Sequence, residues 1–94
     1  MQEFQKEIVA FAKAWEKKRG VTPTAEDIFI HLTEEIGELA REYVNKKERP
    51  GDYSAEKLED SVGDALMQLV RLADIHNLDI EKVVKKIIRE QGVS

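Results

Sequence analysis

Hydrophobic residues recur along this chain at every third or fourth position, the spacing at which side chains share one face of an α-helix. The pattern spans four segments, residues 2–19, 24–47, 55–76 and 80–90. No segment alternates apolar and polar residues with the period of two that is typical of a β-strand. We therefore predict an all-α protein with four helices and short connecting loops.

Each predicted helix has an apolar stripe that we expect to face inward. Trp15 belongs to the first stripe, and we interpret it as a core or interface residue rather than a platform for a stacked base. The other positions are Phe4, Ile8 and Phe11 in the first segment, Ile28, Leu32, Ile36, Leu39 and Tyr43 in the second, Leu58, Val62, Ala65, Leu69 and Leu72 in the third, and Ile80, Val83, Val84, Ile87 and Ile88 in the fourth.

The helix ends are marked by residues with known roles at such positions. Thr24, Ser54 and Asp79 each precede a segment, where an oxygen of the side chain can accept a hydrogen bond from a free backbone N–H of the first turn. Pro50 and Gly51 form the strongest turn signal of the chain. The second and third segments are therefore predicted to form an antiparallel hairpin that turns at the proline.

Acidic residues gather beside the apolar stripe of the second segment. At 100° per residue, Glu35, Glu38 and Glu42, together with His31, follow one edge of that stripe. Like charges at these helical spacings repel one another. A helix that places them beside its core therefore needs cations opposite them or a function for them.

Two glycines relate the acidic positions of the two segments. Gly37 and Gly63 each stand between a β-branched residue and an acid, and each lies 13 positions from Pro50. In a hairpin that turns at the proline they would face each other, where glycine permits a close approach of the backbones. We therefore expect the acids of both segments to lie within about one helical turn of one another.

Glu35, Glu38 and Asp64, with the hydroxyl of Ser61, would then form a cluster of hard oxygen ligands. Such donors suit Mg²⁺ or Mn²⁺ and not zinc. A metal held this way can bridge carboxylates to substrate phosphates, polarise a phosphoryl oxygen and activate water. The cluster indicates phosphate chemistry; the alternative is a solvated helix face, which is common in a chain so rich in charge.

The composition narrows the class of protein. The chain has 94 residues, 41% hydrophobic and 36% charged, and its 19 acids against 15 Lys and Arg give a net charge of −4. The apolar fraction excludes a disordered tail, and the lack of cysteine excludes a disulfide scaffold or a thiolate zinc site. The acidic balance argues against nucleic acid as a partner, and no apolar run reaches the roughly 20 residues of a membrane helix. We expect one soluble, cytoplasmic domain over residues 1–94.

Two short motifs carry a resemblance to a known family. They are Glu35-Ile36-Gly37-Glu38, within the run Glu-Glu-Ile-Gly-Glu-Leu-Ala, and Ser61-Val62-Gly63-Asp64. Over about residues 25–90 the chain resembles the MazG-type nucleotide pyrophosphohydrolases of the all-α NTP pyrophosphatase superfamily. The family pattern is Glu-x-x-Glu on one helix and Glu-x-x-Asp on the next.

The resemblance implies a four-helix MazG-like bundle around a central antiparallel hairpin. It implies that Glu35, Glu38 and Asp64 bind Mg²⁺, with Glu35 and Glu38 as the catalytic residues. The implied reaction hydrolyses a nucleoside triphosphate to a monophosphate and pyrophosphate. Family members are homodimers or homotetramers, and a chain this small needs a second subunit to enclose a nucleotide.

One position departs from the family pattern. Ser61 stands where the second motif has its first glutamate, so a metal ligand is missing. The alternative function is therefore a weakened or inactive MazG-like module that binds nucleotide or only oligomerises. A plain dimerising helical protein is the third possibility. Ser61 itself is either a small residue at a helix contact or a weak ligand.

Other polar residues receive less specific interpretations. His31 and Glu34 are candidates to support the metal ligands, and we expect a hydrogen bond from His31 to Glu35. The basic residues of the last helix usually form solvated surface, but they would approach substrate phosphates if that helix lay beside the acids. The candidates are Lys85, Lys86 and Arg89, and Arg71 of the third segment is similar.

Overall fold

The computed structural model describes residues 2–92, which form four α-helices and one short 3₁₀ helix, with no strand in that range. The elements are α1 (Gln2–Arg19), α2 (Ala25–Glu48), η1 (Pro50–Asp52), α3 (Ala55–Ile75) and α4 (Ile80–Gln91). The prediction of an all-α fold is confirmed. Each predicted helix end lies within one residue of the observed end, because the residues that start and stop these helices act locally.

The predicted N-caps are in place. The Thr24 hydroxyl accepts from the Asp27 N–H at 3.2 Å, and the Asp27 carboxylate accepts from the Thr24 N–H at 2.9 Å, which completes a capping box. The hydrogen bond from the Thr24 backbone, followed by that from its hydroxyl, lowers the pKa of Asp27. Ser54 and Asp79 accept from the backbone N–H groups three residues later.

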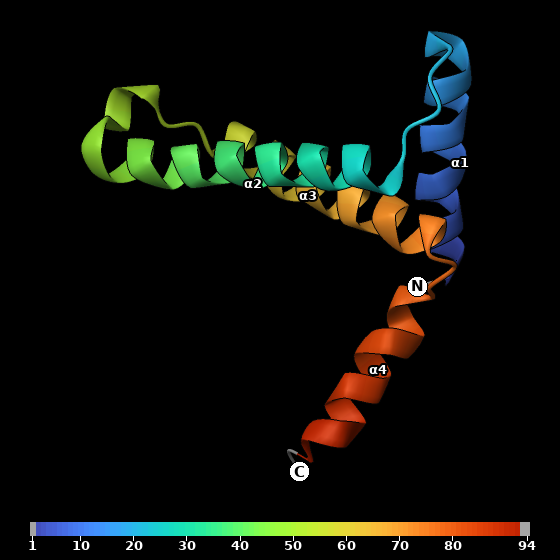
Figure 1. Ribbon diagram of the computed structural model, residues 1–94. Helices are drawn as coiled ribbons and strands as arrows, with labels where there is room; N and C mark the ends of the chain where they lie inside the picture. The colour runs from blue at the N-terminus through green and yellow to red at the C-terminus, as the bar shows by residue number, and fades with distance from the viewer. Residues whose placement is uncertain (1, 93–94) are drawn as a thin grey trace.

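Helices α2 and α3 form the central antiparallel hairpin and run side by side, with η1 in the connection (Figure 1). Ile28 and Leu32 are buried on α2, and so is Glu42, which is 6% exposed. The Glu42 carboxylate accepts a hydrogen bond of 3.4 Å from the Ser54 N–H at the start of α3. Glu42 therefore ties the two helices together at the closed end of the hairpin, and is not a solvated residue.

The two helix glycines do not mediate the hairpin contact. Gly37 and Gly63 are both exposed, and a Cβ atom added to either would meet no atom of another element within 4 Å. The expectation that they face each other is wrong. The hairpin instead packs along the line of Ile28, Leu32 and Leu39, which lies on a different side of α2 from Gly37.

Helix α1 crosses the end of the hairpin and packs on α3 (Figure 1). Ile8 and Ala12 of α1 are buried, as are Val70 and Ala73 of α3, and Val70 is completely inaccessible to solvent. An ion pair of 2.6 Å joins the guanidinium of Arg71 to the Glu16 carboxylate across this contact. The core therefore includes the contact between α1 and α3 as well as Ile28 and Leu32 of the hairpin. The outer part of the predicted α1 stripe, which is Phe4, Phe11 and Trp15, remains exposed in the single chain.

Helix α4 extends away from the other helices (Figure 1). Gln5 of α1 fixes its start: the Gln5 carboxamide accepts from the Ile80 N–H at 3.1 Å and donates to the Leu78 carbonyl at 2.8 Å. All four apolar residues in the middle of α4 are 38–60% exposed, namely Val83, Val84, Ile87 and Ile88. The apolar stripe of α4 is thus real, but the described part of the same chain does not cover it.

A second uncovered surface lies on the hairpin. It consists of Phe29, Ile36 and Tyr43 of α2 and Val62, Leu66 and Leu69 of α3, each 37–60% exposed, and we call it the apolar hairpin face. On each helix these residues lie on the opposite side of the packing line from Glu35 or Asp64. Since Glu35 and Asp64 line one pocket, the exposed apolar residues of α2 and those of α3 lie together on the other face of the hairpin. Within residues 2–92, no helix is long and apolar enough to cross a membrane.

Candidate active site

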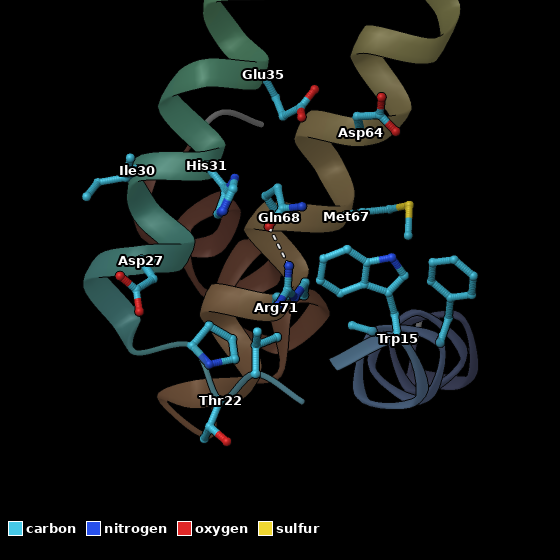
Figure 2. Close-up of a pocket in the computed structure, with 14 residues that line it drawn as sticks. Trp15, Thr22, Asp27, Ile30, His31, Glu35, Asp64, Met67, Gln68 and Arg71 are labelled. Atoms are coloured by element: carbon cyan, nitrogen blue, oxygen red, sulfur yellow. Dashed lines mark hydrogen bonds between the residues drawn. The ribbon is translucent and has the colours of Figure 1, made fainter. Parts of the chain in front are cut away.

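A pocket of about 750 Å³ opens where α1, the α1–α2 loop, α2 and α3 meet (Figure 2). Its volume is in the range of small-molecule sites. Glu35 and Asp64 lie together at one end, while Trp15 and Arg71 lie at the other (Figure 2). The pocket therefore combines an acidic end with an aromatic and cationic end, which is an arrangement suited to a ligand with distinct parts.

The surroundings of Glu35 disfavour a negative charge on its carboxylate. Burial raises its pKa, and the negative charges of Glu38 and Asp64 raise it further. Its Oε2 atom is buried and has no hydrogen-bond partner among the described residues. A buried carboxylate oxygen without a partner is costly. A cation at this position would remove both the unsatisfied oxygen and the mutual repulsion.

The structure thus brings Glu35, Glu38 and Asp64 together, as their positions along the hairpin suggest. Glu38 and Asp64 are exposed to solvent. Among residues 2–92, no three His, Cys, Asp or Glu side chains are already arranged so that they could hold a metal ion. The oxygen donors fit Mg²⁺ or Mn²⁺ chemically, but their side chains would have to adjust to bind it.

Ser61 is buried on α3, with 7% of its surface exposed, and it is not a lining residue of the pocket. Its small size suits the contact between α2 and α3, where a larger side chain would displace its neighbours. The structure therefore places Ser61 as a packing residue of the hairpin, about one helical turn before Asp64 on α3 and outside the lining of the pocket.

His31 lines the pocket, but its partner differs from the predicted one. His31 Nδ1 lies 3.4 Å from a carboxylate oxygen of Glu34, and both side chains are more than half exposed. We expected a hydrogen bond to Glu35 instead. The charge of His31 does lower the pKa of Glu35, as the smallest of the effects on that group. Glu34 points to solvent.

The basic residues of α4 do not reach the pocket within one chain. Lys85 pairs with Glu81 at 3.1 Å and Lys86 with Glu90 at 4.0 Å, both on α4 itself. Arg89 is exposed near the end of the same helix. Because α4 extends away from the hairpin (Figure 1), the condition under which these residues would approach substrate phosphates is not met within the described chain, and the interpretation as solvated surface holds there.

Sequence reasoning did not place α1 and the following loop in the site. Trp15 and Phe11 form part of the pocket wall, as does Pro23, and Thr22 lies at the lower end of the view in Figure 2. The guanidinium of Arg19 lies 4.9 Å from the centre of the Trp15 ring. No local signal marks these residues, because their place depends on how α1 crosses α3.

The fold and the pocket define an all-α protein with a carboxylate-lined site between a central helix hairpin and a crossing N-terminal helix. Residues 23–90 match the MazG nucleotide pyrophosphohydrolase domain, and the chain belongs to this family. Among solved structures it is similar to the crystal structure of the Bacillus-conserved MazG protein, a nucleotide pyrophosphohydrolase. The two are 28% identical, with a TM-score of 0.76 over 99% of this chain and 89% of that chain. No curated protein sequence matches the chain.

Proposed function

We propose that this protein is a Mg²⁺-dependent nucleoside triphosphate pyrophosphohydrolase, which converts a nucleoside triphosphate and water to a monophosphate and pyrophosphate. The observation that carries the proposal is the unpartnered Glu35 oxygen, at the end of a pocket of suitable volume that Asp64 also lines, with the charge of Glu38 close enough to act on Glu35. Membership of the MazG family supports the same reaction. The proposed unit is a single domain over residues 1–94.

Glu35, Glu38 and Asp64 would hold the metal. When bound, Mg²⁺ neutralises phosphate charge and lowers the pKa of a bound water. Glu35 and Glu38 would each place a carboxylate oxygen beside the attacking water, where it could accept the proton of that water. The water oxygen forms the new bond to phosphorus, and pyrophosphate leaves with the electrons of the broken P–O bond.

The test is pyrophosphate release from a panel of common and modified nucleoside triphosphates, with Mg²⁺ and with Mn²⁺. We expect turnover that requires the metal and falls by about 100-fold or more in Glu38→Gln, which removes one charge of the ligand set. Glu56→Gln is the matched control, since Glu56 is exposed in the first turn of α3. Full activity of Glu38→Gln would refute the assignment.

We further propose that the protein is a homodimer or homotetramer. The apolar hairpin face and the apolar residues of α4 are both uncovered in the single chain. Contiguous apolar surface of this extent marks an interaction site. A helix of 12 residues such as α4 is also marginal in water without packing. A second copy supplies the missing contacts and brings further residues to the open side of the pocket.

The second candidate is a MazG-like module without turnover, which the serine at position 61 favours. Ser61→Glu separates the two. We expect the wild type to be active and Ser61→Glu to be less active. Because Ser61 is buried, the larger side chain should also destabilise the fold by about 1–3 kcal/mol through overpacking. Ser61→Ala should keep both properties. Turnover that appears only in Ser61→Glu would instead establish a decayed site, as measured by pyrophosphate release and thermal melting.

A further inference from the structure

The amide of Gln68 is held in one orientation inside the pocket. Arg71 donates to Gln68 Oε1 at 2.9 Å, and because a guanidinium has only donors, the bonded atom of the amide must be its oxygen. The Gln68 nitrogen then points away from Arg71, as Figure 2 shows. No group among residues 2–92 accepts a hydrogen bond from that nitrogen.

Arg71 is itself fixed. Its second terminal nitrogen bonds the Glu16 carboxylate at 2.6 Å, and the two side chains are only 12% and 20% exposed. A partly buried, charge-assisted pair of this kind has little freedom to rotate. Glu16, Arg71 and Gln68 therefore form a chain of hydrogen bonds from α1 to the pocket, which ends in two free N–H groups of Gln68.

The position of Gln68 indicates which part of a ligand it would meet. Gln68 follows Asp64 by one helical turn, so it lies next to the acidic end where phosphates and metal would bind. On its other side lies the indole of Trp15 (Figure 2), an aromatic wall suited to a flat ring. The amide thus lies where the base of a nucleotide would present its edge.

We propose that Gln68, positioned by Arg71, selects nucleotides whose base presents a carbonyl oxygen over those with an amino group at the same place. With its oxygen engaged by Arg71, Gln68 offers donors to the ligand. An oxo group of uracil or hypoxanthine accepts such a donor, whereas the amino group of cytosine or adenine is itself a donor. This inference rests on the proposed function only in requiring that the pocket accept a nucleotide.

The experiment compares two matched pairs of substrates, UTP with CTP and ITP with ATP. Within each pair the first base carries an oxo group where the second carries an amino group. Turnover is measured as kcat/KM, and equilibrium dialysis of UMP and CMP measures binding independently of hydrolysis. We expect the wild type to favour the oxo base by about five- to tenfold, the worth of one hydrogen bond. Gln68→Leu should bring this ratio close to one without changing the affinity for inorganic pyrophosphate.

Two further variants test the orientation. Gln68→Glu keeps a partner for Arg71 but presents an acceptor, so the preference should reverse toward CTP and ATP. Arg71→Met frees the amide of Gln68 to rotate, so the ratio of oxo to amino substrates should fall toward one. Glu16→Gln removes the charged partner that holds Arg71, so the ratio should fall in this variant as well. Circular dichroism and thermal melting confirm that each variant is folded, and Gln68→Glu decides the matter if Arg71→Met does not fold.

The outcomes separate this inference from the proposed function. Turnover with equal use of oxo and amino bases, or a selectivity that survives in both Gln68 variants, overturns the inference and leaves the function. A loss of pyrophosphate affinity in Gln68→Leu overturns it too, since Gln68 would then contact phosphate. Selective binding of UMP without hydrolysis of any triphosphate supports the inference and overturns the function. No binding of any nucleotide overturns both.

Discussion

Glu35→Gln is expected to raise the melting temperature of the metal-free protein and to abolish its response to Mg²⁺. In the wild type the half-buried Glu35 carboxylate has one buried oxygen without a partner and is repelled by Glu38 and Asp64. Glutamine removes the charge and can donate to its two neighbours. A gain of about half a kcal/mol in the free energy of unfolding corresponds to a melting temperature about 2–4 °C higher for a domain of this size.

The response to Mg²⁺ should change in the opposite direction. At 100 times its dissociation constant a ligand stabilises the folded state by about 2.7 kcal/mol, and this stabilisation should disappear in Glu35→Gln. Pyrophosphate release should fall with it. Differential scanning calorimetry with and without Mg²⁺ measures both effects, with Glu56→Gln as the control. A Mg²⁺-dependent shift that persists in Glu35→Gln would remove Glu35 from the ligand set.

The same group gives the metal-free protein a pH dependence of known sign. Because the pKa of Glu35 is raised, the folded chain binds a proton at this carboxylate more tightly than the unfolded chain does. Its contribution to stability is therefore complete below the ordinary glutamate pKa and is lost as the pH rises through the raised value. Mg²⁺ affinity should increase over that window, and both trends should be absent in Glu35→Gln.

Ile36→Asp is expected to convert the protein to monomers and to reduce turnover. Ile36 lies in the apolar hairpin face and is 51% exposed in the single chain. A symmetric interface buries the residue twice, so its loss costs at least about 3 kcal/mol, or more than about 100-fold in the dissociation constant. Val44→Asp is the matched control, because Val44 is an exposed residue of α2 outside that face.

Analytical ultracentrifugation across a range of protein concentrations measures this effect. If the control dissociates and Ile36→Asp does not, the interface lies on another side of α2. If Ile36→Asp is monomeric yet fully active, the second copy has no part in the site. Melting of both variants at high concentration identifies loss of the fold as distinct from loss of assembly.

The helix ends were predictable because their causes are local. Thr24 and Asp79 accept hydrogen bonds from residues three positions away, and that spacing is visible in the sequence. The meeting of Glu35 with Asp64 was also predictable, since helical periodicity and a single turn at Pro50 fix the register of a hairpin. The family resemblance added the identity of the carboxylates but not their geometry.

The remaining features depend on contacts that no local pattern encodes. Periodicity identified Phe11 and Ile36 as apolar stripe residues, but it does not tell burial within one chain from burial between chains. The glycine argument failed because it used spacing from the turn and ignored the side of the helix on which Gly37 lies. The Arg71–Glu16 pair joins residues 55 positions apart, so only the crossing of α1 over α3 reveals it.

The hydrogen bonds of Gln5 have a mechanical consequence for the whole molecule. Gln5 holds the first residues of α4, while Trp15 and Glu16 of the same helix form one end of the pocket and its supporting ion pair. About 15 Å of continuous helix joins these two places. Helix α1 therefore carries the attachment point of α4 near one end and part of the pocket wall near the other, so the position of α4 relative to the pocket is set through this one helix.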